Sequence, residues 1–85
     1  MNRVMVNTVL GPVENIQELL PNEFAVVAKW KEEGVLEHIL IKEAASGAVL
    51  IFQGIDQEKV KQLMSGLPLF KHFQKVDYTV LDKQF

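Results

Sequence analysis

The chain contains no cysteine, one tryptophan and one tyrosine in 85 residues. Without cysteine it has neither a disulfide scaffold nor a thiolate metal site, which argues against a small secreted disulfide domain and a zinc fold. Its two histidines, His38 and His72, lie too far apart in the sequence for a metal-ligand motif. No glycine-rich loop opens a helix, since Gly54 is followed by Ile55 and Asp56. We therefore expect no metal and no cofactor.

The sequence also lacks a large excess of one charge and any long hydrophobic run. Nine Lys and Arg stand against eleven Asp and Glu, and a net charge of −2 does not supply the basic surface that nucleic acid or an anionic membrane requires. No apolar run approaches the length of a transmembrane span. The apolar start at Met1–Val6 is broken by Asn7 and Thr8 before it reaches signal-peptide length. We expect a cytoplasmic protein with no nucleic-acid or membrane partner.

The length favours a single domain, residues 1–85, that buries only about two-thirds of the surface its unfolded chain exposes. Association of copies would therefore add stability. Segments rich in β-branched and apolar residues, bounded by turn residues, predict four strands: Arg3–Leu10, Val35–Lys42, Gly47–Gln53 and Phe73–Leu81. One helix is expected between the first two strands and a second between the last two.

The first predicted helix has an apolar stripe at the helical period and ends at Gly34, a residue typical of the left-handed C′ position. The stripe consists of Leu20, Phe24, Val27 and Ala28. Pro21 leaves two alternatives for the start. Either the main helix begins at Pro21 after a short turn through Glu14–Leu19, or one longer helix kinks at this proline. The first alternative is favoured.

The second predicted helix is marked at both ends. Asp56 is a good N-cap, and Gly66 is expected to take a positive φ as the C′ residue, with Pro68 unable to continue the helix. Its apolar stripe is Val60, Leu63, Met64 and Leu67. The resulting order βαββαβ predicts an α+β, ferredoxin-like fold, with both helices on one face of a four-stranded antiparallel sheet.

The second and third strands are apolar on both faces, as Ile39–Ile41 and Val49–Phe52 show. Because two helices cover only one face, the other face is expected to pack against a second copy of the chain. This predicts a homodimer or higher homo-oligomer. The alternative is a monomer in which Gly11–Leu20 folds back over the open face.

A motif follows the second helix: Leu63-Met64-Ser65-Gly66-Leu67-Pro68-Leu69-Phe70. It resembles the Ser-Gly-Leu-Pro-Leu-Phe segment of the muconolactone delta-isomerase family, small cofactor-free enzymes of the dimeric α+β barrel superfamily. From Gly34 to Phe70 the chain is similar to these isomerases without gaps and retains their histidine as His38. Before Gly34 the likeness is architectural only.

This resemblance implies a cofactor-free proton-shift isomerisation of a small unsaturated lactone or acid. The isomerases carry Trp and Arg around their histidine, whereas this chain has Leu36, Glu37, Leu40 and Ile41. An arginine fork is the usual means of holding a carboxylate, and Lys42 is only a point-charge substitute. The resemblance therefore supports the fold more strongly than it supports muconolactone as the substrate.

His38 is the first candidate for moving a proton, because imidazole titrates near neutral pH. It is expected to share a face with Leu36 and Leu40, while Glu37 points to the opposite face. A structural histidine, hydrogen-bonded in the core or an interface, is the alternative interpretation.

Trp30, Lys42 and Tyr78 are the candidate substrate-binding residues, although aromatic side chains at such positions also serve as core. Glu23 and Glu33 are read as solvated residues of the first helix.

An RNA-recognition domain and a non-catalytic binding module are the alternatives to an isomerase. An RNA-recognition domain would need stacking aromatics and basic residues on its third strand, but Ala48–Phe52 has one aromatic and no base. A non-catalytic dimeric module that binds a small ligand, or acts as a scaffold, stays open because one fold hosts many functions. A ligand-sized cavity containing His38 would favour catalysis, and a filled core would favour the scaffold.

Overall fold

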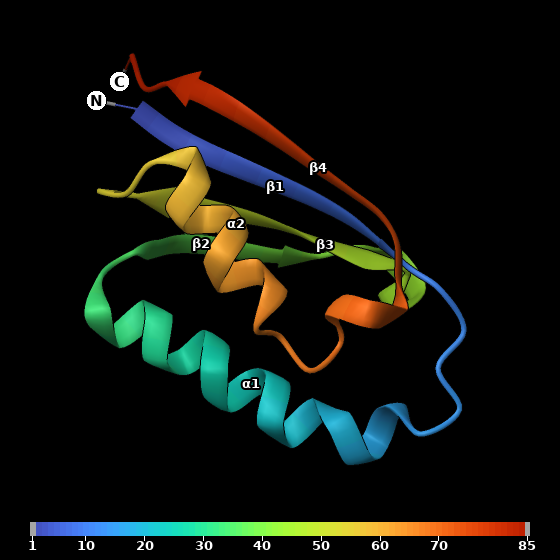
Figure 1. Ribbon diagram of the computed structural model, residues 1–85. Helices are drawn as coiled ribbons and strands as arrows, with labels where there is room; N and C mark the ends of the chain where they lie inside the picture. The colour runs from blue at the N-terminus through green and yellow to red at the C-terminus, as the bar shows by residue number, and fades with distance from the viewer. Residues whose placement is uncertain (1, 85) are drawn as a thin grey trace.

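A computed structural model describes residues 2–84, which form a four-stranded antiparallel sheet with two helices on one face (Figure 1). The strands are β1 (Asn2–Leu10), β2 (Leu36–Ile41), β3 (Gly47–Gln53) and β4 (Phe73–Asp82), and the helices are α1 (Ile16–Glu33) and α2 (Gln57–Ser65). Single 3-10 turns, Glu43–Ala45 and Phe70–His72, precede β3 and β4. The strands lie in the order β2-β3-β1-β4. The predicted ferredoxin-like βαββαβ topology is confirmed.

The core lies between the sheet and the helices. β1 pairs with β3 and β4, and its alternate residues Val4, Val6 and Thr8 are buried beneath the helices. Trp30 of α1 meets Phe52 of β3 edge-on, with 5.5 Å between ring centroids. The buried apolar cluster comprises Val4, Val6, Trp30, Leu36, Leu50, Phe52, Val60, Met64 and Leu67. Both helices are therefore held to the sheet by one continuous core.

α1 begins at Ile16, so the favoured prediction of a start at Pro21 is wrong. Pro21 lies in the second turn and lacks the N–H that would bond the Gln17 carbonyl. Both residues are exposed, so water can satisfy that carbonyl and the helix continues. The predicted end is confirmed, because Gly34 adopts a left-handed φ of 82°. Among residues 2–84, neither helix combines the length and apolarity needed to cross a membrane.

α2 begins as predicted, because the Asp56 carboxylate accepts a 2.8 Å hydrogen bond from the Lys59 N–H. Its end differs. Gly66 has φ −86°, in the right-handed region, so the prediction of a positive φ is wrong. The chain leaves the helix through successive i to i+3 bonds, from Gly66 N–H to Leu63 and from Leu67 N–H to Met64. Such turns keep right-handed residues and need no left-handed glycine.

A bulge in β2 changes which side chains share a face. Leu36 pairs with Phe52 but His38 pairs with Ile51, so Glu37 is the extra residue. Because Phe52 faces the helices and Ile51 faces away, His38 lies on the opposite face from Leu36 and on the same face as Leu40. The predictions that His38 shares a face with Leu36, and that Glu37 points away from His38, are wrong.

Glu37 lies against Arg3 on the face that carries no helix. The guanidinium donates from Nε to one carboxylate oxygen at 2.9 Å and from Nη2 to the other at 3.2 Å. These hydrogen bonds lower the pKa of Glu37, and the nearby charges of Arg3 and Lys83 act in the same direction. The pair ties the bulge of β2 to the beginning of β1, two strands away.

The centre of this open face is apolar, and polar residues such as Asn7 and Thr79 lie beside it. Met5, Val49 and Ile51 are half-buried on it, and Leu40 and Leu81 are 57% and 38% exposed. The alternative that Gly11–Leu20 covers this face is wrong, because the residues from Ile16 onward belong to α1 on the other side of the sheet.

We expect the open face to pair with a second copy. Val49→Lys would place a charge in the centre of that interface, where it cannot be hydrated, and should convert a dimer to monomers. Ser65→Lys on the exposed surface of α2 is the matched control and should stay dimeric. Sedimentation velocity at micromolar concentration measures both. A monomeric wild-type chain would contradict the prediction.

The two glycines at the helix ends should respond oppositely to alanine. Gly66→Ala should raise the free energy of unfolding by about 0.4–1 kcal/mol, because its φ is ordinary and the new Cβ would lie 3.4 Å from the Leu63 carbonyl oxygen. Gly34→Ala should lower it by roughly 1–2 kcal/mol, because alanine resists a φ of 82°. Urea unfolding curves give both signs, and a destabilised Gly66→Ala would contradict the assignment.

Candidate functional site

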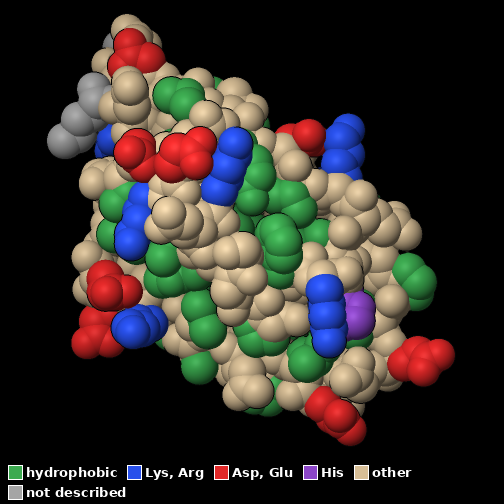
Figure 2. Space-filling model, in the orientation of Figure 1, with side chains coloured by type: hydrophobic (Ala, Val, Ile, Leu, Met, Phe, Trp, Pro, Cys, Tyr) green, Lys and Arg blue, Asp and Glu red, His purple; other side chains and the backbone are tan. Residues whose placement is uncertain are grey.

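A cavity of about 210 Å³ lies between α1, the helix-bearing face of the sheet and the turn after α2. α1 contributes Ile16, Leu20, Glu23 and Val27, and the sheet contributes Thr8, Ala48 and Leu50 among others. Leu67 and Leu69 of the turn close one side. Of all the residues that line it, only Thr8 and Glu23 carry polar side chains. Figure 2 views the molecule from the side that carries the helices and shows hydrophobic side chains on its surface, with charged side chains around them.

Glu23 faces the cavity because it lies on the core stripe of α1. Ile16, Leu20, Glu23, Val27 and Trp30 follow one another at spacings of three or four residues. The interpretation of Glu23 as solvated is wrong, since the residue is only 8% exposed. The signal that could have found it is its spacing, three residues after Leu20 and four before Val27. The predicted stripe contained Phe24, which is 57% exposed, in place of Glu23.

The Glu23 carboxyl has one protein hydrogen-bond donor among residues 2–84. The Leu69 N–H donates to its Oε1 at 3.1 Å, across 46 residues of sequence. Burial raises the pKa of Glu23 above its ordinary value, and the backbone hydrogen bond offsets only part of this effect. Among the residues that the structure describes, no Lys, Arg or His lines the cavity. A buried carboxyl with a raised pKa is a general acid or base suited to neutral pH.

Thr8 has no free hydrogen-bond donor to offer a ligand. Its hydroxyl donates to the Ala48 carbonyl at 3.1 Å and accepts from the Ala48 N–H at 2.9 Å. These two bonds join β1 to β3 under the cavity. Glu23 is therefore the polar group through which this cavity can act on a ligand.

The cavity opens between α1 and the edge strand β2. Phe24, Ile39 and Ile41 line the cavity and are also 57%, 39% and 63% exposed. Exposed apolar side chains at the mouth of an apolar pocket are typical of a route for an apolar ligand.

The residues selected from the sequence do not line this cavity. His38 is exposed on edge strand β2, where it lines a separate depression with residues of α1, and Trp30 is 4% exposed within the core. Tyr78 packs under α2 with the Lys61 ammonium 5.5 Å from its ring centroid, and burial raises its pKa. Lys42 follows β2, where its N–H donates to the Gly47 carbonyl. The structure does not bring these four residues together, and their roles in binding or catalysis stay predictions.

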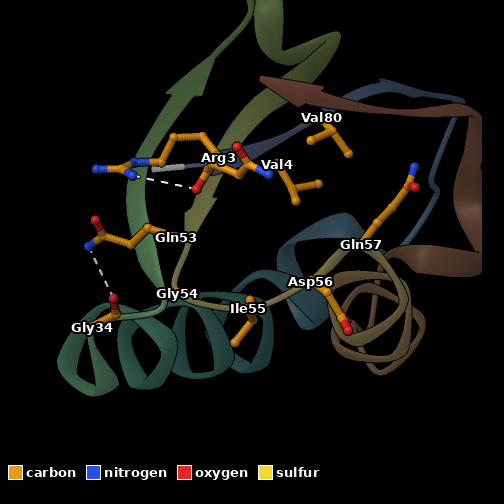
Figure 3. A pocket seen from close by; sticks show the side chains of 10 residues that line it. Arg3, Val4, Gly34, Gln53, Gly54, Ile55, Asp56, Gln57 and Val80 are labelled. Atoms are coloured by element: carbon orange, nitrogen blue, oxygen red, sulfur yellow. Dashed lines mark hydrogen bonds between the residues drawn. The ribbon is translucent and has the colours of Figure 1, made fainter. Parts of the chain in front are cut away.

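A larger depression, about 630 Å³, lies at the end of the sheet where Arg3 and Val4 meet the loop before α2 (Figure 3). Its charged groups are already engaged: Arg3 pairs with Glu37, and Asp56 caps α2. The Gln53 side-chain amide donates to the Gly34 carbonyl at 3.1 Å. This depression is therefore a weaker candidate than the cavity around Glu23.

Glu23→Gln should change how stability depends on pH. The pKa of Glu23 is raised in the folded state, so as pH rises from 4.5 through the folded-state pKa the unfolded chain releases the proton first and the folded state loses stability. Glutamine does not titrate, so the variant should gain stability relative to the wild type across this window. Urea unfolding at pH 4 to 8 measures the difference, and a constant difference would contradict the assignment.

Comparison with known proteins supports the fold. No family model matches the sequence, and no match is found among curated proteins. A solved structure described as the crystal structure of antibiotic biosynthesis monooxygenase matches 98% of this chain and 98% of that chain, with a TM-score of 0.65 and 16% sequence identity. Likeness at this identity concerns the backbone arrangement alone. The chain therefore shares the ferredoxin-like α+β fold of that monooxygenase.

Proposed function

We propose that this chain binds a small, mainly apolar molecule between α1 and the sheet and shifts a proton on it through Glu23, without a cofactor. The observation that carries the proposal is the buried carboxyl of Glu23, the one ionisable side chain that lines an otherwise apolar cavity. Cavities with few, well-placed polar groups are the usual form of small-molecule sites.

The chemistry requires a base that removes a proton beside a carbonyl group and returns it elsewhere on the same molecule. A carboxylate whose pKa is raised by burial is a stronger base than an exposed glutamate and holds the proton until it is returned. The Leu69 N–H holds Oε1 and so orients the carboxyl. Oε2 has no protein hydrogen-bond partner among residues 2–84 and is the oxygen that would exchange the proton.

The motif that resembles muconolactone delta-isomerases takes part in this site. Leu67 and Leu69 line the cavity, and the Leu69 N–H binds Glu23. This supports an isomerase-like activity, with Glu23 rather than His38 as the group nearest to a bound ligand. His38 lines a separate depression at the edge between α1 and β2, together with Phe24 and Lys31, and would need a ligand there to act as the proton carrier.

A non-catalytic ligand-binding module is the second candidate. The observation that favours it is the lack of a free side-chain donor for an enolate oxygen. The Thr8 hydroxyl donates to the Ala48 carbonyl, and apart from Glu23 the other described side chains that line the cavity are apolar. In that case the cavity would bind a ligand that Glu23 holds without transforming it.

Deuterium uptake from solvent into small cyclic enones and unsaturated lactones, followed by NMR, tests the proposal. Glu23→Gln should slow exchange by roughly 10²–10⁴, because the amide cannot accept the proton. Glu33→Gln, an exposed change on the same helix, should keep the wild-type rate.

His38→Ala separates the two proposed proton carriers. If exchange survives His38→Ala but not Glu23→Gln, the cavity mechanism stands. If His38→Ala abolishes exchange and Glu23→Gln does not, Glu23 is not the base. Ligand binding without exchange in the wild type would favour the binding module.

A further inference from the structure

No positively charged side chain of residues 2–84 lines the cavity around Glu23. Its lining comes from α1, from β1, β2 and β3, from the start of β4, and from the turn after α2, and none of these contributes Lys, Arg or His to it. An ionised carboxylate moved into such surroundings loses its hydration and gains no partner, so it is disfavoured or becomes protonated. A bound acid would also share the cavity with Glu23, and two carboxyl groups in one site cannot both ionise readily.

The backbone and hydroxyl groups at the cavity do not compensate. The Leu69 N–H is occupied by Glu23, and Thr8 exchanges both of its hydrogen bonds with Ala48. An anion would therefore find no free donor except Glu23 itself in its protonated form. A carbonyl oxygen, by contrast, can accept one hydrogen bond from that protonated carboxyl.

The volume restricts the size of the ligand. A dry apolar cavity of about 150 Å³ holds benzene, and this cavity measures about 210 Å³. It therefore accommodates one ring with a short substituent. The mouth formed by Phe24, Ile39 and Ile41 is apolar as well, so nothing along the entrance attracts an anion.

We propose that the ligand is an uncharged one-ring ketone or lactone whose carbonyl oxygen accepts a hydrogen bond from the protonated carboxyl of Glu23, that this carboxyl ionises before it removes a proton from the ligand, and that the cavity rejects carboxylates. This inference rests on the proposed function, since it names the substrate class of the same site. It separates this chain from an enzyme for muconolactone, which bears a carboxylate.

Acetophenone and benzoate form a matched pair of probes, because they share one ring and differ chiefly in charge at neutral pH. Titration of the wild-type protein at pH 7, followed by protein NMR, should show acetophenone shifting the Leu67 and Leu69 amide signals. Benzoate should bind there at least tenfold more weakly. Benzoate should gain affinity as the pH is lowered towards the pKa of benzoic acid.

Variants of Glu23 test the hydrogen bond. Glu23→Gln keeps a donor and should bind acetophenone within a few-fold of the wild type, whereas Glu23→Met keeps the length without a donor and should bind about tenfold more weakly. Glu33→Gln is the control and should bind both probes as the wild type does.

Benzoate binding as tightly as acetophenone, or no shift of the cavity signals with either probe, would overturn the ligand class. A different outcome would contradict the proposed function. Acetophenone binding that depends on Glu23, together with no deuterium exchange on any enone or lactone, would leave the ligand class standing and remove the catalysis. Glu23-dependent exchange on an acid but not on a neutral lactone would do the reverse.

Discussion

The hydrogen bond from the Leu69 N–H to the Glu23 carboxyl joins two parts of the molecule that are 46 residues apart in the sequence. It fixes the turn after α2 against the middle of α1, and this turn forms one side of the cavity. A carboxyl on the core stripe of a helix would be costly without a partner. The bond reduces that cost and orients the group. This contact therefore links the acid of the cavity to the turn that closes it, alongside the burial of Leu67 and Leu69.

The bulge in β2 has consequences on both faces of the sheet. It keeps Leu36 in the core above Phe52 while it turns Glu37 and His38 to the open face. There Glu37 meets Arg3 in a two-point ion pair that includes the fork geometry of guanidinium and carboxylate. Beyond the bulge, Ile39 and Ile41 return to the helix side and form the mouth of the cavity. One inserted residue thus places Glu37 and His38 on the open face and Ile39 and Ile41 at the entrance of the cavity.

The two faces of the sheet serve different purposes in this interpretation. The helix-bearing face carries the core and the cavity around Glu23, and the open face carries half-buried apolar residues beside the Arg3 and Glu37 pair, against which we propose that a second copy packs. Because the cavity lies wholly on the helix side, ligand binding does not require residues from a partner. Dimerisation would contribute stability, which a chain of this length gains least from its own core.

The sequence by itself determined the element order, because turn residues, alternating strands and helical stripes act over a few positions. It located β3 and the Asp56 cap, and the end of α1 at Gly34. The tertiary structure alone decided the site. The bulge in β2 depends on pairing with β3, and the burial of Glu23 depends on which stripe of α1 meets the sheet. The predicted catalytic residue His38 does not line the cavity, because the bulge shifts β2 by one residue and so moves the His38 side chain to the other face.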